Sequence, residues 1–533
     1  MTNSKKTKTE KTEVTISDNL TQVDYSFNYL SPEHFYTIGK FFGLNPPKIE
    51  SARVLYVGLG ASTAAINFAS LYPQAKVVGL CDAKGLIEAS TKQVKDLGIN
   101  NIELKYISFA DILDSVGEFD YIICNGVFSR VSKEQQLKIL QVMKKSLTKN
   151  GIAHVGYNTL PGWNIVKTFR DMMRYHASIF EKNEDKLVQA ELFVKFMLDS
   201  FAEEKSPYAR FLRDEARILQ STDMGYVWNE YLSEESSQFY FSDFMDLAND
   251  AGLSYLGDTH LPSMYTGNLP AKAFEQLEAI DDIVRTEQYM DFITNRRFRN
   301  TLLCHDNLNI DRSVSEDVVD GLFISVNMAP EIAMDKIDFT DEKTIVNFIF
   351  QPHNLLFSTS SPLVKALAYA FNQSQFKFLT LEEIKKFVAS KCTKMSPQDI
   401  DKSVKSSLLE MIIKGVAIIR AVKPKIAESI SAFPEIGKLA LSQATSDMPY
   451  ITNQLNDTIP VNIIYKSVMK YLDGKNDLNQ IAEIIYKDYL STDKFKLSAE
   501  GEVITDKEQQ KKMSENIVNQ TLNFCFSSAF LAK

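Results

Sequence analysis

Two glycines that follow a short apolar segment predict a nucleotide-binding turn near the start of the chain. The apolar residues 54–57 run into Gly58 and Gly60, and Asp82 follows a second strand-like segment over 76–80. Glycines let the backbone approach a ligand closely, and an acidic side chain after the second strand accepts hydrogen bonds from ribose hydroxyls. The spacing therefore predicts a nucleotide-containing cofactor at the ends of the first two strands.

The neighbouring residues favour S-adenosylmethionine over a dinucleotide as this cofactor. The third glycine position of the dinucleotide fingerprint holds Thr63, and a pyrophosphate needs that close approach to a helix N-terminus. S-adenosylmethionine has no pyrophosphate; Asp111 after the third strand can meet its adenine, and Asn125 after the fourth can face its methionine end. The order of these residues favours a methyltransferase over a dehydrogenase. As alternatives, Asp111 is a helix N-cap and Asp82 a turn residue.

Strands and helices that alternate along the chain are expected to position the predicted cofactor residues. The expected strands span 53–57, 76–80, 102–108, 121–124 and 152–157, with helices over 62–70, 85–97 and 133–147 between them. This alternation predicts an α/β fold with a parallel, doubly wound sheet. A helical stretch over about 164–240 precedes a helix at 241–251 and a strand at 253–257. We expect this stretch to be an insertion above the carboxyl edge of the sheet, where ligands bind.

The rest of the chain predicts two further domains. A strongly periodic helix is expected over 281–305, a β-rich region over 310–350, a winged-helix-like module over 361–425 and a helical region from about 430 to 533. The expected domains are a disordered tail at 1–20, a cofactor-binding core at 21–265, a middle domain at 266–430 and a C-terminal domain at 431–533.

Composition narrows the class of protein. The chain has 533 residues and a net charge of -9, which argues against a nucleic-acid partner because such proteins carry basic surfaces. Its five cysteines are far apart with no CxxC pair, so we expect neither disulfides nor a metal site. This cysteine pattern predicts that the protein is found in a reducing cytoplasm. No apolar run approaches the roughly 18 residues that span a bilayer, so no membrane insertion is expected.

Several longer motifs add a resemblance. They are GYNTLPGW at 156–163, EQYMDF at 287–292, Arg296 with FR at 298–299 and LLCH at 302–305, and LDG at 472–474. With these motifs the chain resembles bacterial S-adenosylmethionine-dependent methyltransferases that carry a methyltransferase regulatory domain. Among them it is most similar to rickettsial protein-lysine methyltransferases that modify outer membrane protein B. The resemblance covers nearly the whole chain from about residue 20.

The resemblance implies a fold, a cofactor and a substrate. The fold is a Rossmann-like class I methyltransferase core with a seven-stranded, mostly parallel sheet, and the cofactor is S-adenosyl-L-methionine. The implied activity is protein-lysine N-methylation of a bacterial outer-membrane surface protein, by a cytoplasmic enzyme that could form a homo-oligomer. The chain departs from the family at Tyr56, where an acidic residue is usual, at Cys81, which takes the place of the acidic residue now at Asp82, and at Asn125, where a histidine is usual.

Methylation of lysine sets requirements for the acceptor site. The amine must be neutral although its reference pKa is about 10.4, and a desolvated aromatic pocket both lowers that pKa and tolerates the cationic product. We expect Tyr157 to orient the amine, Asn158 to accept its hydrogen bonds and Trp163 to wall the channel. In the alternative reading, Tyr157 and Trp163 pack the inserted helices onto the sheet. Arg296, with the other arginines of its motif, is expected in buried ion pairs of the core.

Two other functions remain open from the sequence. The first is a non-catalytic protein that binds S-adenosylmethionine, a reading that the departures at Tyr56, Cys81 and Asn125 support. The second is a methyltransferase for another acceptor, either nucleic acid, as the winged-helix-like region suggests, or a small molecule. Net charge argues against the nucleic acid, and the length of chain beyond the sheet argues against a small molecule.

Overall fold

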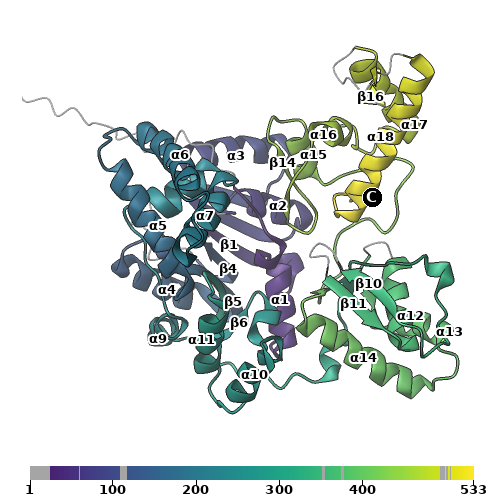
Figure 1. Cartoon of the computed structure of the whole chain (residues 1–533), viewed down its shortest axis with the longest axis horizontal. Helices are drawn as coiled ribbons and strands as arrows, with labels where there is room; N and C mark the ends of the chain where they lie inside the picture. Colours follow the sequence, from purple (N-terminus) through teal and green to yellow (C-terminus); the bar gives the residue numbers. More distant parts are fainter. Residues whose placement is uncertain are drawn as a thin grey trace, which may run out of the picture.

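The computed structural model describes residues 24–58, 60–107, 117–350, 355–373, 377–492, 498–499, 502–503 and 506–532. Figure 1 shows three parts: a large sheet with its helices in purple to teal, a smaller green part below on the right, and a yellow C-terminal part above it. The expected tail at 1–20 and the predicted adenine contact Asp111 lie outside the described residues.

A seven-stranded sheet forms the first part and has the strand order β3-β2-β1-β4-β5-β7-β6. Five parallel strands come first: β1 (Arg53–Gly58), β2 (Lys76–Cys81), β3 (Ile102–Tyr106), β4 (Phe119–Asn125) and β5 (Leu147–Asn158). They are completed by β6 (Leu253–Asp258) and by β7 (Phe298–His305), which runs antiparallel to both of its neighbours. The expected seven-stranded, mostly parallel fold is confirmed. The strand order reverses between β1 and β4, the position at which such sheets bind ligands.

Strand β7 corrects the expected helix over 281–305. The helix α11 (Ile283–Thr294) ends where Asn295 adopts a left-handed conformation with φ of 50°, a common way to end a helix. Residues 298–305 then enter the sheet between β5 and β6, where Leu302, Leu303 and Cys304 are buried. A strand covered on both faces reads as a continuous apolar run, and periodicity cannot distinguish it from a helix. The sheet therefore extends beyond the expected domain boundary at 265.

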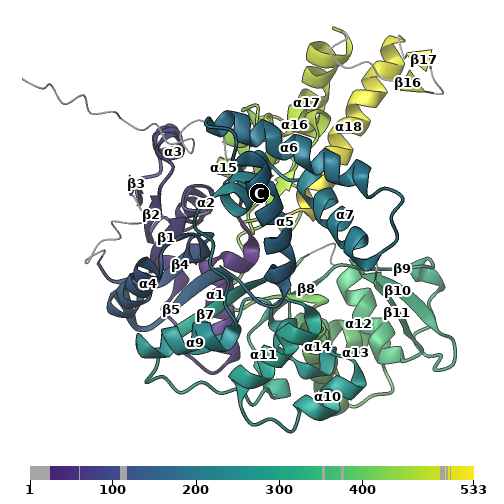
Figure 2. The same cartoon turned by 60° about the vertical axis from the view of Figure 1, so that its left-hand side comes forward.

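Helices cover both faces of the sheet, and the inserted helices form a cluster of their own. Against the sheet lie α1 (Pro32–Phe41), α2 (Thr63–Leu71), α3 (Lys84–Asp96), α4 (Lys133–Ser146) and α9 (Phe241–Asp250). The insertion consists of α5 (Gly162–Ala177), α6 (Asn183–Ser200), α7 (Pro207–Gln220), α8 (Met224–Val227) and a π-helical turn at Trp228–Leu232. Figure 2 shows α5, α6 and α7 grouped as one layer, and they share a separate apolar core around Phe169 and Met173.

The remaining two parts are smaller. After the short α10 (Ala271–Leu277), the middle part holds strands β8 (Phe323–Val326), β9 (Met328–Pro330), β10 (Val346–Phe350), β11 (Leu355–Thr359), β12 (Leu379–Thr380) and β13 (Ala417–Arg420), with helices α12 (Pro362–Gln373), α13 (Leu381–Lys391) and α14 (Pro397–Ile413). The C-terminal part holds α15 (Lys438–Ala444), β14 (Tyr450–Thr452), β15 (Thr458–Pro460), α16 (Ile463–Met469), α17 (Leu478–Ile485), β16 (Ser498–Ala499), β17 (Glu502–Val503) and α18 (Lys507–Ser527).

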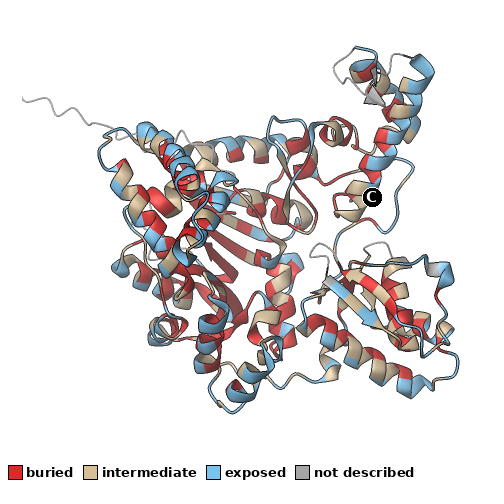
Figure 3. Ribbon diagram, in the orientation of Figure 1, coloured by how far each residue is buried: buried red, intermediate tan, exposed pale blue. Residues whose placement is uncertain are grey.

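The apolar cores do not follow the division into three parts. Figure 3 shows buried residues concentrated along the central strands. One apolar core joins the large sheet to the middle part, whereas the C-terminal part has its own core around Met469 and Ile485. Within the described residues, no helix combines the length and the apolar character that crossing a bilayer requires.

Candidate functional site

The carboxyl ends of β1 and β4 lie against each other at the predicted cofactor site. Gly58 pairs with Asn125 in the register of the two strands. Gly58 has φ of 87°, and a Cβ there would lie 2.3 Å from the Val127 side chain and 2.4 Å from the Asn125 carbonyl oxygen. Gly60 has φ of 86°. These values lie in the left-handed region that side chains disfavour, so both positions favour glycine, and at Gly58 the close approach of Asn125 and Val127 also leaves no room for a side chain.

A carboxylate from the N-terminal segment holds the glycine loop. Asp24 Oδ1 accepts a hydrogen bond from the backbone N–H of Gly60 at 2.5 Å, and Oδ2 accepts from the N–H groups of Ser62 and Thr63 at 3.1 and 2.6 Å. The Ser62 hydroxyl donates a fourth bond at 2.6 Å. Helix α2 begins at Thr63, and the Ser62 side chain does not cap it. Asp24 therefore supplies the negative charge that a helix N-terminus favours.

Asp82 and Arg130 lie near each other beside the glycine loop. The Asp82 side chain is exposed, yet the surrounding protein raises the pKa of its carboxyl, an effect that nearby Arg130 opposes. The buried Cys81 thiol has its pKa raised to about 12 by burial, so this residue carries no charge where the family's acidic residue usually stands.

A pocket of about 310 Å³ opens between this edge of the sheet, the inserted helices and the N-terminal segment. Its walls combine seven aromatic side chains with four asparagines, three carboxylates and two arginines. The lining residues are Tyr25, Phe27, Tyr29, Asn125, Gly126, Arg130, Asn158, Trp163, Val166, Glu215, Ile218, Asp223, Tyr226, Asn229, Glu230, Tyr231, Arg297, Phe298 and Asn300. Three of the predicted site residues, Asn125, Asn158 and Trp163, thus line one cavity.

Asn158 and Trp163 enter the pocket from the exit of β5. The Asn158 side-chain amide donates a hydrogen bond to Glu230 Oε2 at 3.1 Å, and its backbone N–H donates to Ser129 Oγ at 2.9 Å. Trp163 begins α5 and is 4% exposed, and its indole Nε1 has no hydrogen-bond partner. Buried polar atoms are almost always paired, so this donor marks a place where a ligand atom can accept a hydrogen bond.

Tyr157 lies on the other face of the strand. Its hydroxyl forms a hydrogen bond with Thr301 Oγ1 at 3.0 Å, and its ring stacks on Phe244 with centroids 4.0 Å apart. Successive side chains of a strand point to opposite faces, so Tyr157 and Asn158 cannot both enter the pocket. Burial also raises the pKa of Tyr157. The geometry supports the packing reading of Tyr157 and gives no support to its expected role in orienting the amine.

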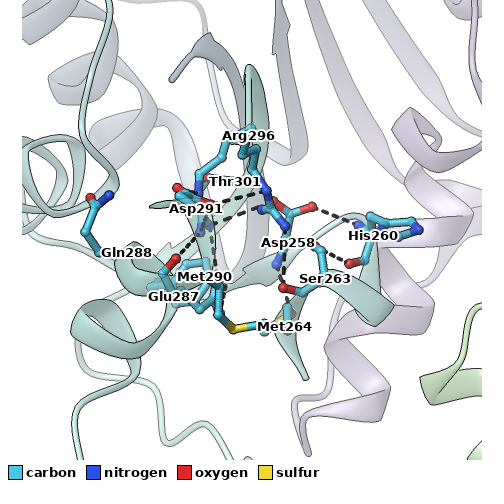
Figure 4. A network of polar contacts seen from close by, with 12 residues as sticks. Asp258, His260, Ser263, Met264, Glu287, Gln288, Met290, Asp291, Arg296 and Thr301 are labelled. Carbon is cyan, nitrogen blue, oxygen red and sulfur yellow. Dashed lines mark hydrogen bonds and ion pairs between the residues drawn. The ribbon is translucent and has the colours of Figure 1, made fainter. Parts of the chain in front are cut away.

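The motif residues between 287 and 299 form, with Asp258, a buried ion network that holds β7 in the sheet. Figure 4 shows the carboxylates of Asp258 and Asp291 directed toward Arg296, with separations of 3.3 and 3.2 Å. Arg299 donates to both oxygens of Asp291 at 2.7 and 2.9 Å and to Glu287 at 2.9 Å. These contacts confirm the expected core role of the two arginines.

Arg297 differs from these neighbours because it points toward the insertion. Its Nη1 lies 2.7 Å from Glu215 Oε2 on α7, at the wall of the pocket. Phe298 and Asn300 follow on the pocket side of β7. The buried network therefore fixes the strand from which three pocket residues project.

Several functional candidates had no sequence signal. Asp24 precedes the glycines by 36 positions, and Glu230 lies 72 positions beyond Asn158, so only the fold brings them to the site. Arg130 follows Asn125 in the same loop, and its position after the fourth strand could have indicated it. Among the described residues, no group of three or more His, Cys, Asp or Glu side chains could hold a metal ion.

Family models match three stretches of the chain. A methyltransferase domain matches residues 49–206, a predicted methyltransferase regulatory domain matches 223–305, and a PKMT C-terminal winged helix domain matches 433–530. The winged helix is thus assigned to the C-terminal part, whereas the sequence suggested such a module at 361–425.

Relatives cover nearly the whole chain. The uncharacterized protein RP789 of Rickettsia prowazekii is 37% identical over 519 residues, which are 96% of this chain and 93% of that protein. The uncharacterized protein RP028 of the same organism is 45% identical over 224 residues, which are 42% of this chain and 90% of that protein. The structure of PKMT2 from Rickettsia typhi in complex with AdoHcy superposes with a TM-score of 0.87 at 39% identity, covering 95% of this chain and 99% of that one.

Proposed function

Because the chain belongs to the family of S-adenosylmethionine-dependent methyltransferases that includes PKMT2 from Rickettsia typhi, we propose that it methylates lysine side chains of a bacterial outer-membrane surface protein. The observation that carries this proposal is one pocket in which the loop after β4, through Asn125, meets aromatic side chains such as Trp163. Cofactor and acceptor must meet in this way, because methyl transfer depends on holding two reactants in line.

The cofactor residues fit S-adenosylmethionine. When bound, the cofactor supplies an electrophilic methyl group on sulfur. We assign the close approach of the backbone to Gly58 and Gly60, the ribose contact to Asp82, the adenine contact to Asp111 and the methionine end to Asn125. The support for this assignment is the position of four of these residues at one edge of the sheet, at the ends of the adjacent strands β2, β1 and β4.

The aromatic walls of the pocket have the chemistry to bind the side chain of an acceptor lysine. Aromatic rings attract an ammonium group through cation–π contacts, and the pocket presents rings from three directions: Tyr25, Phe27 and Tyr29 from the N-terminal segment, Trp163 and Tyr226 from the insertion, and Phe298 from β7. Burial raises the pKa of Tyr29 to about 12, so its ring stays neutral. The Asn158 side chain orients groups in the pocket, and Trp163 forms its wall.

The partner is a protein rather than a small molecule. Two whole parts of the chain beyond the sheet are available to hold an extended substrate, and the resemblance to methyltransferases of outer membrane protein B points to an outer-membrane surface protein. The insertion also exposes Tyr175, Ile179, Leu192 and Phe196, an apolar surface that supports the expectation of a homo-oligomer. The substrate would be met in the cytoplasm, before export.

The test is incubation of the full chain with radiolabelled S-adenosylmethionine and an unfolded, lysine-rich outer-membrane surface protein, followed by mass mapping. We expect label on lysine ε-amines. Calorimetric binding of the cofactor without transfer to any protein would favour the alternative of a non-catalytic binding protein. Label on nucleic acid or on a small molecule instead would reject the proposed acceptor.

A further inference from the structure

The charges in the pocket are not evenly neutralised. Glu215 is buried and pairs with Arg297 at 2.7 Å, and the Tyr231 hydroxyl donates to its other oxygen. Asp223 caps α8 by accepting from the Tyr226 N–H at 3.0 Å. Both carboxylates therefore already have structural partners.

Glu230 has a different environment. Its Oε2 accepts a hydrogen bond from Asn158 at 3.1 Å, and no lysine, arginine or histidine of the described chain forms an ion pair with it. The nearby Arg170 donates from Nε to the Glu230 backbone oxygen at 3.1 Å and also bonds the carbonyls of Ser233 and Glu234. That guanidinium is thus engaged with the backbone and holds the turn that presents Glu230.

We propose that Glu230 receives the ε-ammonium group of the substrate lysine, an inference that rests on the proposed function. A carboxylate among aromatic rings provides both attractions that a cation needs, a charge partner and π faces. Arg130 lines the same pocket, but its charge also acts on Asp82 and Cys81 at the cofactor edge. Arg297 is paired with Glu215. Arg130, the other arginine of the pocket, therefore lies toward the cofactor edge, whereas Glu230, the carboxylate without an ion pair, lies on the insertion.

Trp163 provides an independent indication that a ligand enters here. It is 4% exposed, it lines the pocket, and its indole Nε1 has no partner in the described structure. Leaving such a donor unpaired is costly. A carbonyl group of the peptide that carries the lysine is an acceptor of the right chemistry for this N–H.

The reaction accounts for the charge at Glu230. The lysine nitrogen first gives one proton to a water molecule, and its lone pair then forms a bond to the sulfonium methyl carbon. The carbon–sulfur bond breaks, and its electron pair remains on sulfur. The positive charge passes from sulfur to the methylated nitrogen, so Glu230 faces a cation both before deprotonation and after transfer.

The test is Glu230→Gln in the full chain, assayed with an unfolded, lysine-rich surface protein. We expect the KM for that protein to rise tenfold or more, while the dissociation constant of S-adenosylmethionine stays within a factor of two. The acid limb of the kcat profile should move to lower pH, by about one unit, because the bound ammonium loses an anionic neighbour. Glu230→Asp, which keeps the charge, should leave that limb in place.

Asp223→Asn is the matched control, because it removes a charge from the same pocket while asparagine still caps the helix. An unchanged KM and acid limb in Glu230→Gln, or equal effects in Asp223→Asn, would overturn the assignment. If the wild type transfers no label to lysine, the proposed function fails instead. Glu230 is then tested by calorimetry with a lysine peptide and S-adenosylhomocysteine, and equal affinity of wild type and Glu230→Gln would reject it.

Discussion

The carboxylate of Asp24 lies 2.5 Å from the backbone nitrogen of Gly60 and closes the glycine loop from outside the sheet. The same short segment reaches the C-terminal part, because Ser26 Oγ and Thr458 Oγ1 are 2.9 Å apart and Asn28 N–H donates to Asp457 at 2.8 Å. One strip of chain thus connects the predicted cofactor loop with the winged-helix part.

Replacing Asp24 with alanine should weaken both cofactor binding and the fold. The change removes four hydrogen bonds to the loop, and charge-assisted bonds contribute about 1.5–3 kcal/mol each, not additively. We expect the free energy of unfolding to fall by about 2–3 kcal/mol and the dissociation constant of S-adenosylmethionine, measured by calorimetry, to rise by about tenfold or more. Ser26→Ala, which loses only the contact with Thr458, is the control and should bind the cofactor normally.

Gly58→Ala should disrupt the cofactor edge because of contact as well as strain. An added Cβ lies within 2.4 Å of the Asn125 carbonyl oxygen, in a backbone with φ of 87°. Gly98→Ala is a matched control, since Gly98 has φ of 64° and nothing within 4 Å of the added Cβ. Strain alone costs roughly 1–2 kcal/mol. We expect Gly98→Ala to lose about that much stability by denaturant unfolding and Gly58→Ala to lose more, because only its added Cβ meets neighbouring atoms. Gly58→Ala alone should lose cofactor affinity, and equal affinities would remove Gly58 from the site.

Local patterns predicted the core of the fold because each strand is short, apolar and bounded by turns. Gly58, Asn125 and Asn158 could be proposed as site residues for a related reason, because each is the last residue of a parallel strand. Strand β7 was missed because a fully buried strand has no alternation to distinguish it from a helix. The motif at 287–305 contains the end of helix α11 and all of strand β7. Arg299 on β7 joins the two elements by pairing with Glu287 and Asp291 on α11.

Long-range partners could not be predicted, because nothing in the sequence places them together. Asp24 and Glu230 reach the site from the N-terminal segment and the insertion, and Arg297 reaches it from the position just before β7. The assignment of Tyr157, which the geometry does not support, came from a local pattern. The motif drew attention to Tyr157 and Asn158 together, but neighbouring residues of a strand face opposite ways, so only one of the pair could line the pocket.

Trp163→Phe should separate ligand binding from packing. Phenylalanine keeps most of the apolar contact but removes the unpartnered Nε1 donor. Since a buried donor without a partner is destabilising by about 1–3 kcal/mol, we expect the melting temperature to stay the same or rise slightly. The KM for the protein substrate should increase severalfold if the donor binds it. A lower melting temperature with unchanged KM would show that Trp163 only packs the insertion.

His34 should make stability depend on pH. Its Nε2 lies 2.7 Å from the Thr259 carbonyl oxygen, and its Nδ1 accepts from Arg420 at 3.3 Å, so the neutral ring joins α1 to the loop after β6 and to β13. Burial and the adjacent Arg420 charge lower the pKa of His34 to about 3. The unfolded chain, with a histidine pKa near 6.5, therefore binds a proton that the folded protein does not.

The contribution of neutral His34 to the free energy of unfolding is fully present above about pH 6.5 and is lost as the pH falls toward 3. Each pH unit corresponds to about 1.4 kcal/mol for one group, so His34 should contribute a loss of about 2 kcal/mol between pH 6.5 and 5. The measurement is urea unfolding at both pH values for the wild type and for His34→Gln. We expect the variant to be less stable at pH 6.5 but to lose less on acidification to pH 5, and an equal loss in the two proteins would show that His34 does not set this dependence.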